Sequence, residues 1–162
     1  FTGAAVGAAL RGIVVLDLAH VERISSFGVR EWLAMLDAAR EHVQELYLAR
    51  LSEAAATQMG MIRSLAGGGR LTSFYAPYLC DACGKSSRRL IDCERDAEAI
   101  RSRNAPPGIC PSCRSATTLD DDPSYFAFAT SHAGVAIPAG KADQFRDFIL
   151  SFNPRQVTGF GG

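Results

Sequence analysis

Two C-x-x-C pairs constrain the fold of this chain more than any other feature, because four cysteines that bind one ion must meet in space. Cys80 and Cys83 form the first pair, Cys110 and Cys113 form the second, and 26 residues separate the pairs. Four thiolates at this spacing suit a tetrahedral structural zinc with no open coordination position. The intervening segment is too short to bury a core of its own, so we predict that Zn²⁺ joins the two pairs. Two disulfides, an iron centre or free thiols are the alternatives.

The distribution of the cysteines also predicts a reducing, cytoplasmic location. All five lie between residues 80 and 113, unlike the spread of a disulfide scaffold. Cys93 has no neighbour at knuckle spacing, and we interpret it as a small buried thiol, the alternative being that it replaces one ligand. His20, His42 and His132 share no metal-ligand spacing. No apolar run approaches the roughly 20 residues that a bilayer-spanning helix needs.

Residues 12–33 predict a strand, a polar turn and a helix. Residues 13–18 are an apolar run of strand length, typical of a parallel strand covered on both faces. The following helix has Ser26 as its expected N-cap. A strand at 45–51, a helix at 53–65 capped by Ser52, and a strand at 70–79 come next. This alternation predicts a mixed, mostly parallel α/β sheet with right-handed crossovers, and residues 1–3 are expected to end a strand that starts upstream.

Composition changes at residue 80, where charged residues, cysteine, proline and serine replace the apolar pattern. We therefore expect three parts: an α/β domain over 1–79, a zinc-ribbon segment over 80–129, and a connection, helix and flexible tail over 130–162. Residues 125–129 are predicted to form a short aromatic strand, and Pro77 to lie on an edge or at a bend. The final helix, over 142–152, carries a phenylalanine-rich face that packs on its own domain or forms a homodimer contact.

Charge and motifs argue against several functions. Seventeen basic and seventeen acidic residues cancel, and residues 80–126 hold seven basic against eight acidic residues. A broad nucleic-acid footprint is therefore not expected, although a local stripe around Arg88 and Arg89 remains as the alternative. The sequence contains none of the catalytic motifs that we considered, which predicts a non-enzymatic protein. A dithiol redox enzyme would carry one C-x-x-C at a strand-to-helix junction, and these two pairs lack that context.

The residues VVLDL at 14–18 and ISSFGV at 24–29 resemble the STAS domain of anti-sigma factor antagonists. In that family a strand is followed by a D-[ST]-[ST]-G turn that caps a helix. The resemblance covers residues 1–78 and implies a bacterial regulatory module that binds an anti-sigma factor or a serine-kinase-like protein. It does not account for the cysteine segment, which looks like an added zinc ribbon. The alternative function is a zinc-ribbon protein that binds nucleic acid or is associated with transcription.

The resemblance implies a partner-binding or regulatory role for Asp17, Ser25, Ser26, Phe27, Gly28 and Arg30. The family's phosphoacceptor position falls on Phe27, which cannot accept phosphate, and its leading aspartate falls on Ser25. Phosphorylation of Ser25 or Ser26 would be favoured electrostatically at a helix N-terminus, and the other interpretation is that both are capping and turn residues. Asp17 either shapes the docking surface or ends its strand by bonding to the backbone of the next turn.

Overall fold

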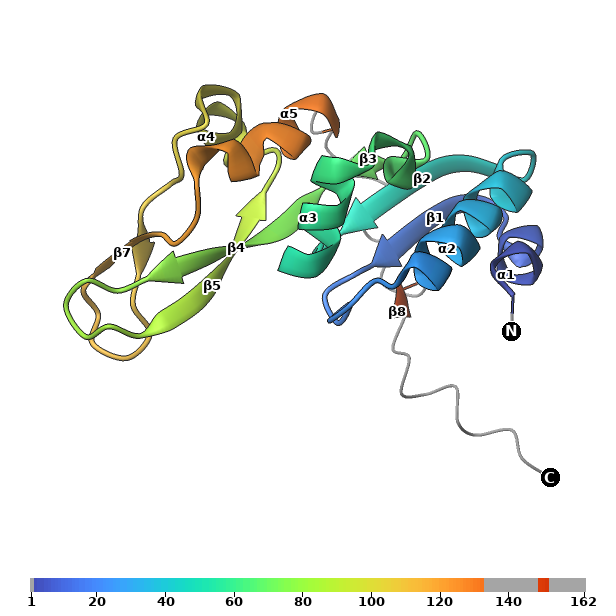
Figure 1. Ribbon diagram of the computed structural model, residues 1–162. Coiled ribbons are helices and arrows are strands. Elements are labelled where there is room, and N and C mark those ends of the chain that lie inside the picture. The colour runs from blue at the N-terminus through green and yellow to red at the C-terminus, as the bar shows by residue number, and fades with distance from the viewer. Residues whose placement is uncertain (1, 133–148, 152–162) are drawn as a thin grey trace.

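Two sheets organise the computed structural model, which describes residues 2–132 and 149–151 of the 162-residue chain (Figure 1). The parallel sheet has the strand order β3-β2-β1-β8, and the antiparallel sheet has the order β5-β4-β7-β6. The predicted mixed α/β class is confirmed, although only one of the two sheets is parallel. The strands are β1 Gly12–Asp17, β2 Val43–Ala49, β3 Arg70–Leu71, β4 Ser73–Leu79, β5 Ser86–Asp92, β6 Gly108–Ile109, β7 Ala116–Leu119 and β8 Ile149–Ser151.

The parallel sheet is built on β1, whose apolar run is buried as predicted. The four residues from Val14 to Asp17 are all buried, which fits a strand covered on both faces. β1 pairs in parallel with β2, with Leu16 opposite Leu48. The helices of this half are α1 Gly3–Ala9, α2 Ser26–Ala39 and α3 Glu53–Met61. Ser52 caps α3, since its hydroxyl accepts the N–H of Ala55, and this predicted cap is confirmed.

Helix α1 begins at Gly3, where we expected the end of a strand. Thr2 is in an extended conformation and caps α1 with its hydroxyl. Two glycines one helical turn apart let α1 approach α2 closely. A Cβ on Gly3 would lie 1.7 Å from the carbonyl oxygen of Glu31, and one on Gly7 would lie 2.1 Å from that of Met35. Only glycine therefore fits at either position in this crossing.

The single strand predicted over 70–79 is two strands, one in each sheet. Thr72 marks the change. Its N–H donates to the carbonyl of Leu48 in the parallel sheet, and its carbonyl accepts the N–H of Cys93, which follows β5. Both bonds are 2.9 Å long. The strand propensity of the residues does not reveal this division, because the backbone stays extended while its hydrogen-bonding partners change from one sheet to the other.

Pro77 lies inside β4, which is an interior strand, so the edge, one of the two placements that we expected, is wrong. The carbonyl of Pro77 accepts the N–H of Asp120 at 2.9 Å, so its ring nitrogen also faces β7. The regular β4–β7 ladder contains only Tyr78 opposite Leu119 and Leu79 opposite Thr118. The missing donor therefore falls where that ladder ends, which is how an interior strand accommodates proline.

The aromatic strand predicted at 125–129 is helical instead. A 3-10 helix spans Pro123–Phe126 and continues as α5 Ala127–His132. Proline in the first turn and the side-chain cap from Asp122 both favour a helical start. Tyr125, Phe126 and Phe128 then surround Phe74 of β4, with ring centroids 5.0–6.3 Å from it. This packing favours a helix over a strand for residues 125–129, because the aromatic side chains that contact Phe74 follow helical rather than alternating spacing.

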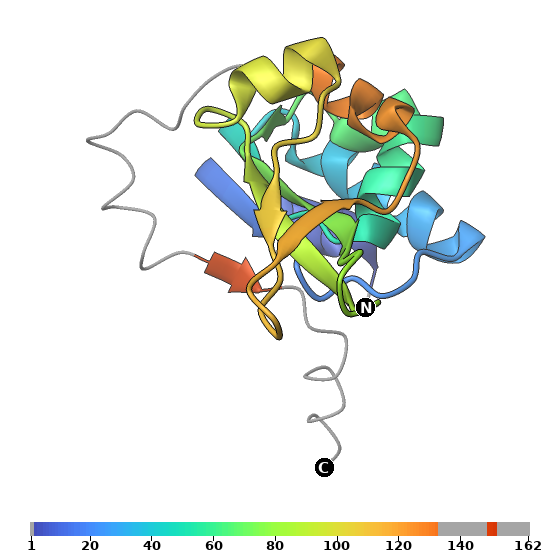
Figure 2. The same ribbon diagram turned by 90° about the vertical axis from the view of Figure 1, so that its left-hand side faces the viewer.

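One core serves both sheets. It includes Leu51 and Met59 from the α3 side together with Phe74, Ile91 and Phe126 from the antiparallel half. Helices α4 Ala97–Ser102 and α5 lie on the same side of the antiparallel sheet (Figures 1 and 2). The expected domain boundary after residue 79 stays a prediction, and β4, which precedes it, pairs with β5, which follows it.

The predicted helix over 142–152 falls mostly outside the described residues. Its last part is corrected, because Ile149–Ser151 forms strand β8, which pairs in parallel with β1. Among the helices that are described, none combines the length and the hydropathy of a membrane-spanning segment.

The α1–α2 crossing gives a matched pair of glycine variants. We expect Gly7→Ala to lower the free energy of unfolding by about 1–3 kcal/mol, because the new methyl group overlaps the carbonyl of Met35. Gly60→Ala in α3 should instead raise the free energy of unfolding by roughly 0.5–1 kcal/mol, because alanine favours the helix and the new Cβ would lie 3.9 Å from its nearest neighbour, the Cβ of Phe128. Urea denaturation measures both, and equal effects would contradict the close crossing.

Candidate functional site

Each C-x-x-C pair lies at the tip of a β-hairpin. The first pair connects β4 to β5, and the second connects β6 to β7. Because β4 and β7 pair antiparallel, the end of β4 lies beside the start of β7, and the two tips meet at one end of the molecule (Figure 1). The fold thus brings together two pairs of cysteines that 26 residues separate in sequence.

The two tips share one backbone conformation. In each, the N–H of the first cysteine donates to the carbonyl of the residue five positions later. The carbonyl of the same cysteine accepts the N–H of the residue four positions later. These bonds are Cys80 to Lys85 at 3.0 Å, Gly84 to Cys80 at 2.8 Å, Cys110 to Ser115 at 2.8 Å and Arg114 to Cys110 at 3.0 Å. Gly84 has φ 68° and Arg114 has φ 65°. Arg114 therefore adopts the left-handed conformation without glycine's freedom, at a cost of about 1–2 kcal/mol.

The four sulfurs are spaced for one tetrahedral ion. The Sγ atoms of Cys80 and Cys113 are 3.5 Å apart, and those of Cys83 and Cys110 are 3.7 Å apart. All four lie within 4.8 Å of one another. Zn–S bonds of about 2.3 Å place tetrahedral sulfurs ~3.8 Å apart, whereas a disulfide needs about 2.05 Å. The cysteines are free thiols that can hold a metal ion, and the set is consistent with zinc.

Hydrogen bonds at the tips set the protonation of the thiols. The hydroxyl and the N–H of Ser115 lower the pKa of Cys113 to about 6. The N–H of Lys85 lowers the pKa of Cys83, but local desolvation and contacts with the other three cysteines outweigh it and raise that pKa to about 12. Crowded thiols thus keep a proton that a bound cation would displace, because thiolates are the metal-binding form.

Cys93 takes no part in this cluster. It is buried just after β5, as the sequence predicted, and packs in the shared core. Burial raises the pKa of its thiol to about 12, with Asp92 and Asp96 contributing. His20 and His42 are exposed. Within the described residues, the four cysteines are the one group whose ligand atoms converge for a metal.

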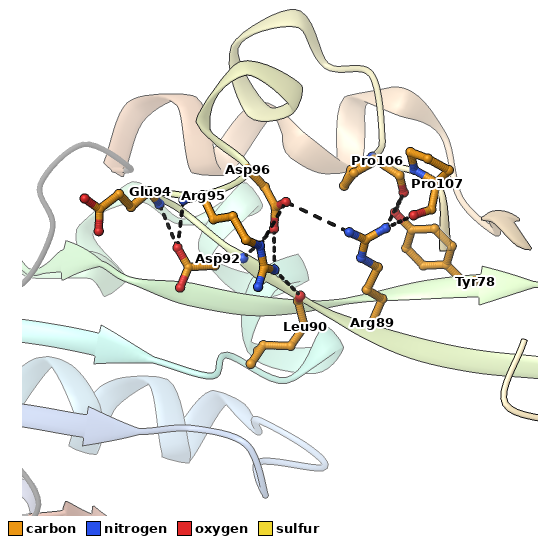
Figure 3. A network of polar contacts seen from close by, with 9 residues as sticks. All are labelled: Tyr78, Arg89, Leu90, Asp92, Glu94, Arg95, Asp96, Pro106 and Pro107. Carbon is orange, nitrogen blue, oxygen red and sulfur yellow. Dashed lines mark hydrogen bonds and ion pairs between the residues drawn. The ribbon is translucent and has the colours of Figure 1, made fainter. Parts of the chain in front are cut away.

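A polar network holds the segment between the two pairs, as Figure 3 shows. Arg89 of β5 donates to the carbonyls of Pro106 and Pro107, which precede the second hairpin. Its other guanidinium nitrogen lies 3.9 Å from Asp96. The hydroxyl of Tyr78 donates to the carbonyl of Pro106 at 2.6 Å. These contacts fix where the second hairpin begins, and so they help to set the position of its cysteines.

Asp96 is the acidic centre of this network. It accepts the N–H of Asp92 at 2.9 Å and Nη2 of Arg95 at 2.8 Å. Burial raises the pKa of Asp96, but these hydrogen bonds and the charges of Arg95 and Arg89 lower it more, so the carboxylate is favoured. Because the pKa of Asp96 is lower in the folded protein than the unfolded value of about 3.9, its carboxylate stabilises the fold at pH values above that unfolded pKa. This stabilisation is lost as the pH falls through the folded-state pKa.

The turn before α2 is the second candidate site, and here one prediction was wrong. Ser25, rather than Ser26, is the N-cap of α2, since its Oγ accepts the N–H of Gly28 at 3.1 Å. Ser26 is the first helical residue and is exposed. Phe27 is 60% exposed, and the guanidinium of Arg30 lies 5.0 Å from its ring centroid. We call Ser25 to Arg30 the docking turn.

Glycine at position 28 is not required by the fold. A Cβ there would meet Oγ of Ser25 at 3.6 Å and Cγ2 of Ile24 at 3.7 Å, which are ordinary contacts. Gly28 therefore differs from Gly3 and Gly7, whose Cβ atoms would overlap backbone.

Asp17 is buried at the end of β1 and does not belong to the exposed surface of the docking turn. It is 5% exposed, and its Oδ1 accepts the N–H of Ala19 at 3.1 Å, the backbone contact that the sequence offered as one interpretation. It also forms a two-point ion pair with Arg50, whose Nε donates to Oδ1 at 3.1 Å. Sequence reasoning missed Arg50. The signal was its place one residue after β2, beside the carboxyl end of β1.

Ser52 holds the same loop from the other side. Its N–H donates to the carbonyl of Leu18 at 3.2 Å, and its hydroxyl donates to that of Val21 at 2.6 Å. The loop leading to the docking turn is thereby fixed to the start of α3. Figure 1 shows that α2 begins far from the hairpin tips, so the two candidate sites are separate.

Comparisons of the chain with protein-family models, with curated proteins and with solved structures gave no match. The STAS resemblance therefore stays a prediction that is based on the residues themselves.

Metal removal tests the four-cysteine site. We expect one zinc ion per chain, and a loss of several kcal/mol of stability, about 10 °C or more in Tm, when a strong chelator removes it. Cys80→Ser should lose the stoichiometric metal, whereas Cys93→Ala should keep it because Cys93 lies outside the cluster. Elemental analysis with thermal denaturation checks both, and iron in place of zinc would identify the other tetrahedral thiolate centre.

Asp96→Asn tests the network between the pairs. We expect a loss of about 1–3 kcal/mol at neutral pH, because the amide leaves the surrounding N–H donors and cations poorly satisfied. Glu98→Gln is the matched control, since the Glu98–Arg101 pair is exposed and should contribute under about 0.5 kcal/mol. Denaturant titration of zinc-loaded protein measures the difference, and equal losses would refute a special role for Asp96.

Proposed function

We propose that this chain is a non-catalytic regulatory module of STAS type that binds a protein partner through the docking turn and carries a structural zinc. The observation on which the proposal depends is Phe27, an aromatic side chain left 60% exposed in the first turn of a helix. Aromatic and arginine side chains together are typical of the residues that dominate binding energy at protein interfaces.

The surroundings of the docking turn support binding without large rearrangement. Asp17 and Ser52 hold the loop that precedes it through backbone contacts. Ser25 caps α2 and so fixes the first turn on which Phe27 is presented. Such preorganisation reduces the ordering cost of association. Asp17 acts in this proposal as a positioning residue, because it is buried.

Gly28 supports the same surface. The fold has room for a side chain at this position, so the fold itself does not require glycine. A partner that approaches the backbone closely would require it. The proposed partner is an anti-sigma factor or a serine-kinase-like protein, as the STAS resemblance implies. Phosphorylation is not part of the proposal, since Phe27 occupies the acceptor position and the hydroxyl of Ser25 already caps the helix.

The zinc is proposed to be structural. The β4–β7 ladder has two residue pairs, and β6 has two residues, so backbone pairing alone holds the second hairpin weakly against the first. Four thiolates leave no open position for substrate. The alternative, nucleic-acid binding by this half, is weakened because three of its seven cations, Arg89, Arg95 and Arg101, are paired with acidic side chains.

Phe27→Ala tests the docking turn. Affinity capture from the native host identifies the partner, and calorimetry with the purified partner measures its affinity. We expect Phe27→Ala and Gly28→Arg each to weaken binding by at least about tenfold, the effect of losing an interface anchor or blocking close approach. Met61→Ala is the control, because Met61 is 73% exposed but lies at the end of α3.

Unchanged affinity in both docking-turn variants would overturn the proposal, provided that circular dichroism shows that they remain folded. A titration with DNA and RNA at low salt tests the alternative, and tight binding there that Phe27→Ala leaves intact would favour the nucleic-acid function.

A further inference from the structure

Exposure divides the four cysteines into two pairs. Cys83 and Cys113, the second member of each C-x-x-C, are exposed, whereas Cys80 and Cys110 are buried. A structural metal site that is closed to solvent would have no such asymmetry. The side of the cluster formed by Cys83 and Cys113 is therefore the more open to small solutes, and exposed thiolates are the ones that oxidants attack first.

Each exposed sulfur lies next to a buried sulfur of the other hairpin. Cys113 is 3.5 Å from Cys80, and Cys83 is 3.7 Å from Cys110. These two sulfur–sulfur distances both cross between the hairpins, within a cluster whose four sulfurs all lie within 4.8 Å of one another. Every exposed thiolate has a resolving thiolate within reach, which is the arrangement that converts a sulfenic acid into a disulfide.

We propose that the four-cysteine site is also a peroxide-reactive site, at which oxidation releases the metal and leaves two disulfides, Cys80–Cys113 and Cys83–Cys110, that keep the two hairpins joined. This inference depends on the zinc of the proposed function, and it adds a reaction that a purely structural zinc site does not have.

The reaction balances with hydrogen peroxide as the oxidant. The exposed thiolate of Cys113 attacks one peroxide oxygen, so that an S–O bond forms, the O–O bond breaks and hydroxide leaves. The thiolate of Cys80 then attacks the sulfenic sulfur, so that an S–S bond forms and a second hydroxide leaves. Cys83 and Cys110 react in the same way. The four thiolates lose four electrons to two peroxide molecules, and the zinc dication is released.

The pairing decides what happens to the fold. Disulfides across the hairpins span 33 and 27 residues of sequence, whereas a disulfide within one C-x-x-C spans three. Crosslinks over longer loops stabilise a fold more. The cross-hairpin bonds replace the metal at the same place beside the β4–β7 ladder, so the oxidised protein keeps its antiparallel sheet. Bonds within each pair would leave the tips unconnected.

The test uses the full chain with zinc bound, in the Cys93→Ala background so that the core thiol does not complicate the assignment. Metal content is measured first, then peroxide is added, zinc release is followed with a chromogenic chelator, and the disulfides are mapped by peptide mass spectrometry. We expect one zinc released for every two peroxide molecules consumed, with Cys80–Cys113 and Cys83–Cys110 as the products. The circular dichroism spectrum should stay that of folded protein.

Disulfides within the C-x-x-C pairs, crosslinks between chains, or thiols that stay reduced under excess peroxide would each overturn the proposal. Cys83→Ser sharpens the test, because it should yield Cys80–Cys113 alone, and a Cys110–Cys113 bond in its place would refute the pairing. If no metal is found before oxidation, the zinc of the proposed function fails, while the disulfide map still decides the pairing.

Discussion

The extended segment that passes from one sheet into the other is the constraint on which the rest of the structure depends. At Thr72 the backbone bonds to β2 through its N–H and to the residue after β5 through its carbonyl, so neither sheet can shift without the other. Leu51 and Phe74 form a further parallel bridge at the same junction. The side chain of Phe74 is fully buried among aromatic rings of the α5 region. Two halves with different sheet types thereby share one core.

Distance from this core determines which parts need other support. The hairpins extend away from it toward their tips, where the loops are exposed, and the second hairpin has a ladder of only two residue pairs. Two devices act there: the four sulfurs at the tips, and the Arg89–Asp96 network closer to the core. The network fixes the start of the second hairpin, and a metal bound by the cysteines would fix its tip. A small segment with little apolar area commonly depends on such crosslinks.

The docking turn depends on the same junction from the other direction. Arg50 follows β2, its N–H donates to Oγ of Ser73 in β4, and its guanidinium holds Asp17 at the end of β1. Asp17 in turn holds the loop that leads to α2. Arg50 has φ 49°, an uncommon value for a residue other than glycine, which the surrounding bonds maintain. The surface proposed for partner binding is therefore presented by rigid elements.

The sequence by itself determined the features that depend on local spacing. These are the buried strand β1, the Ser52 cap and the four cysteines, because a C-x-x-C loop and a helix cap are short-range structures. Tertiary structure alone decided the rest. The helical form of residues 125–129 depends on packing against Phe74. The division at Thr72 and the Asp17–Arg50 pair join residues at least 20 positions apart, and no local pattern encodes such partners.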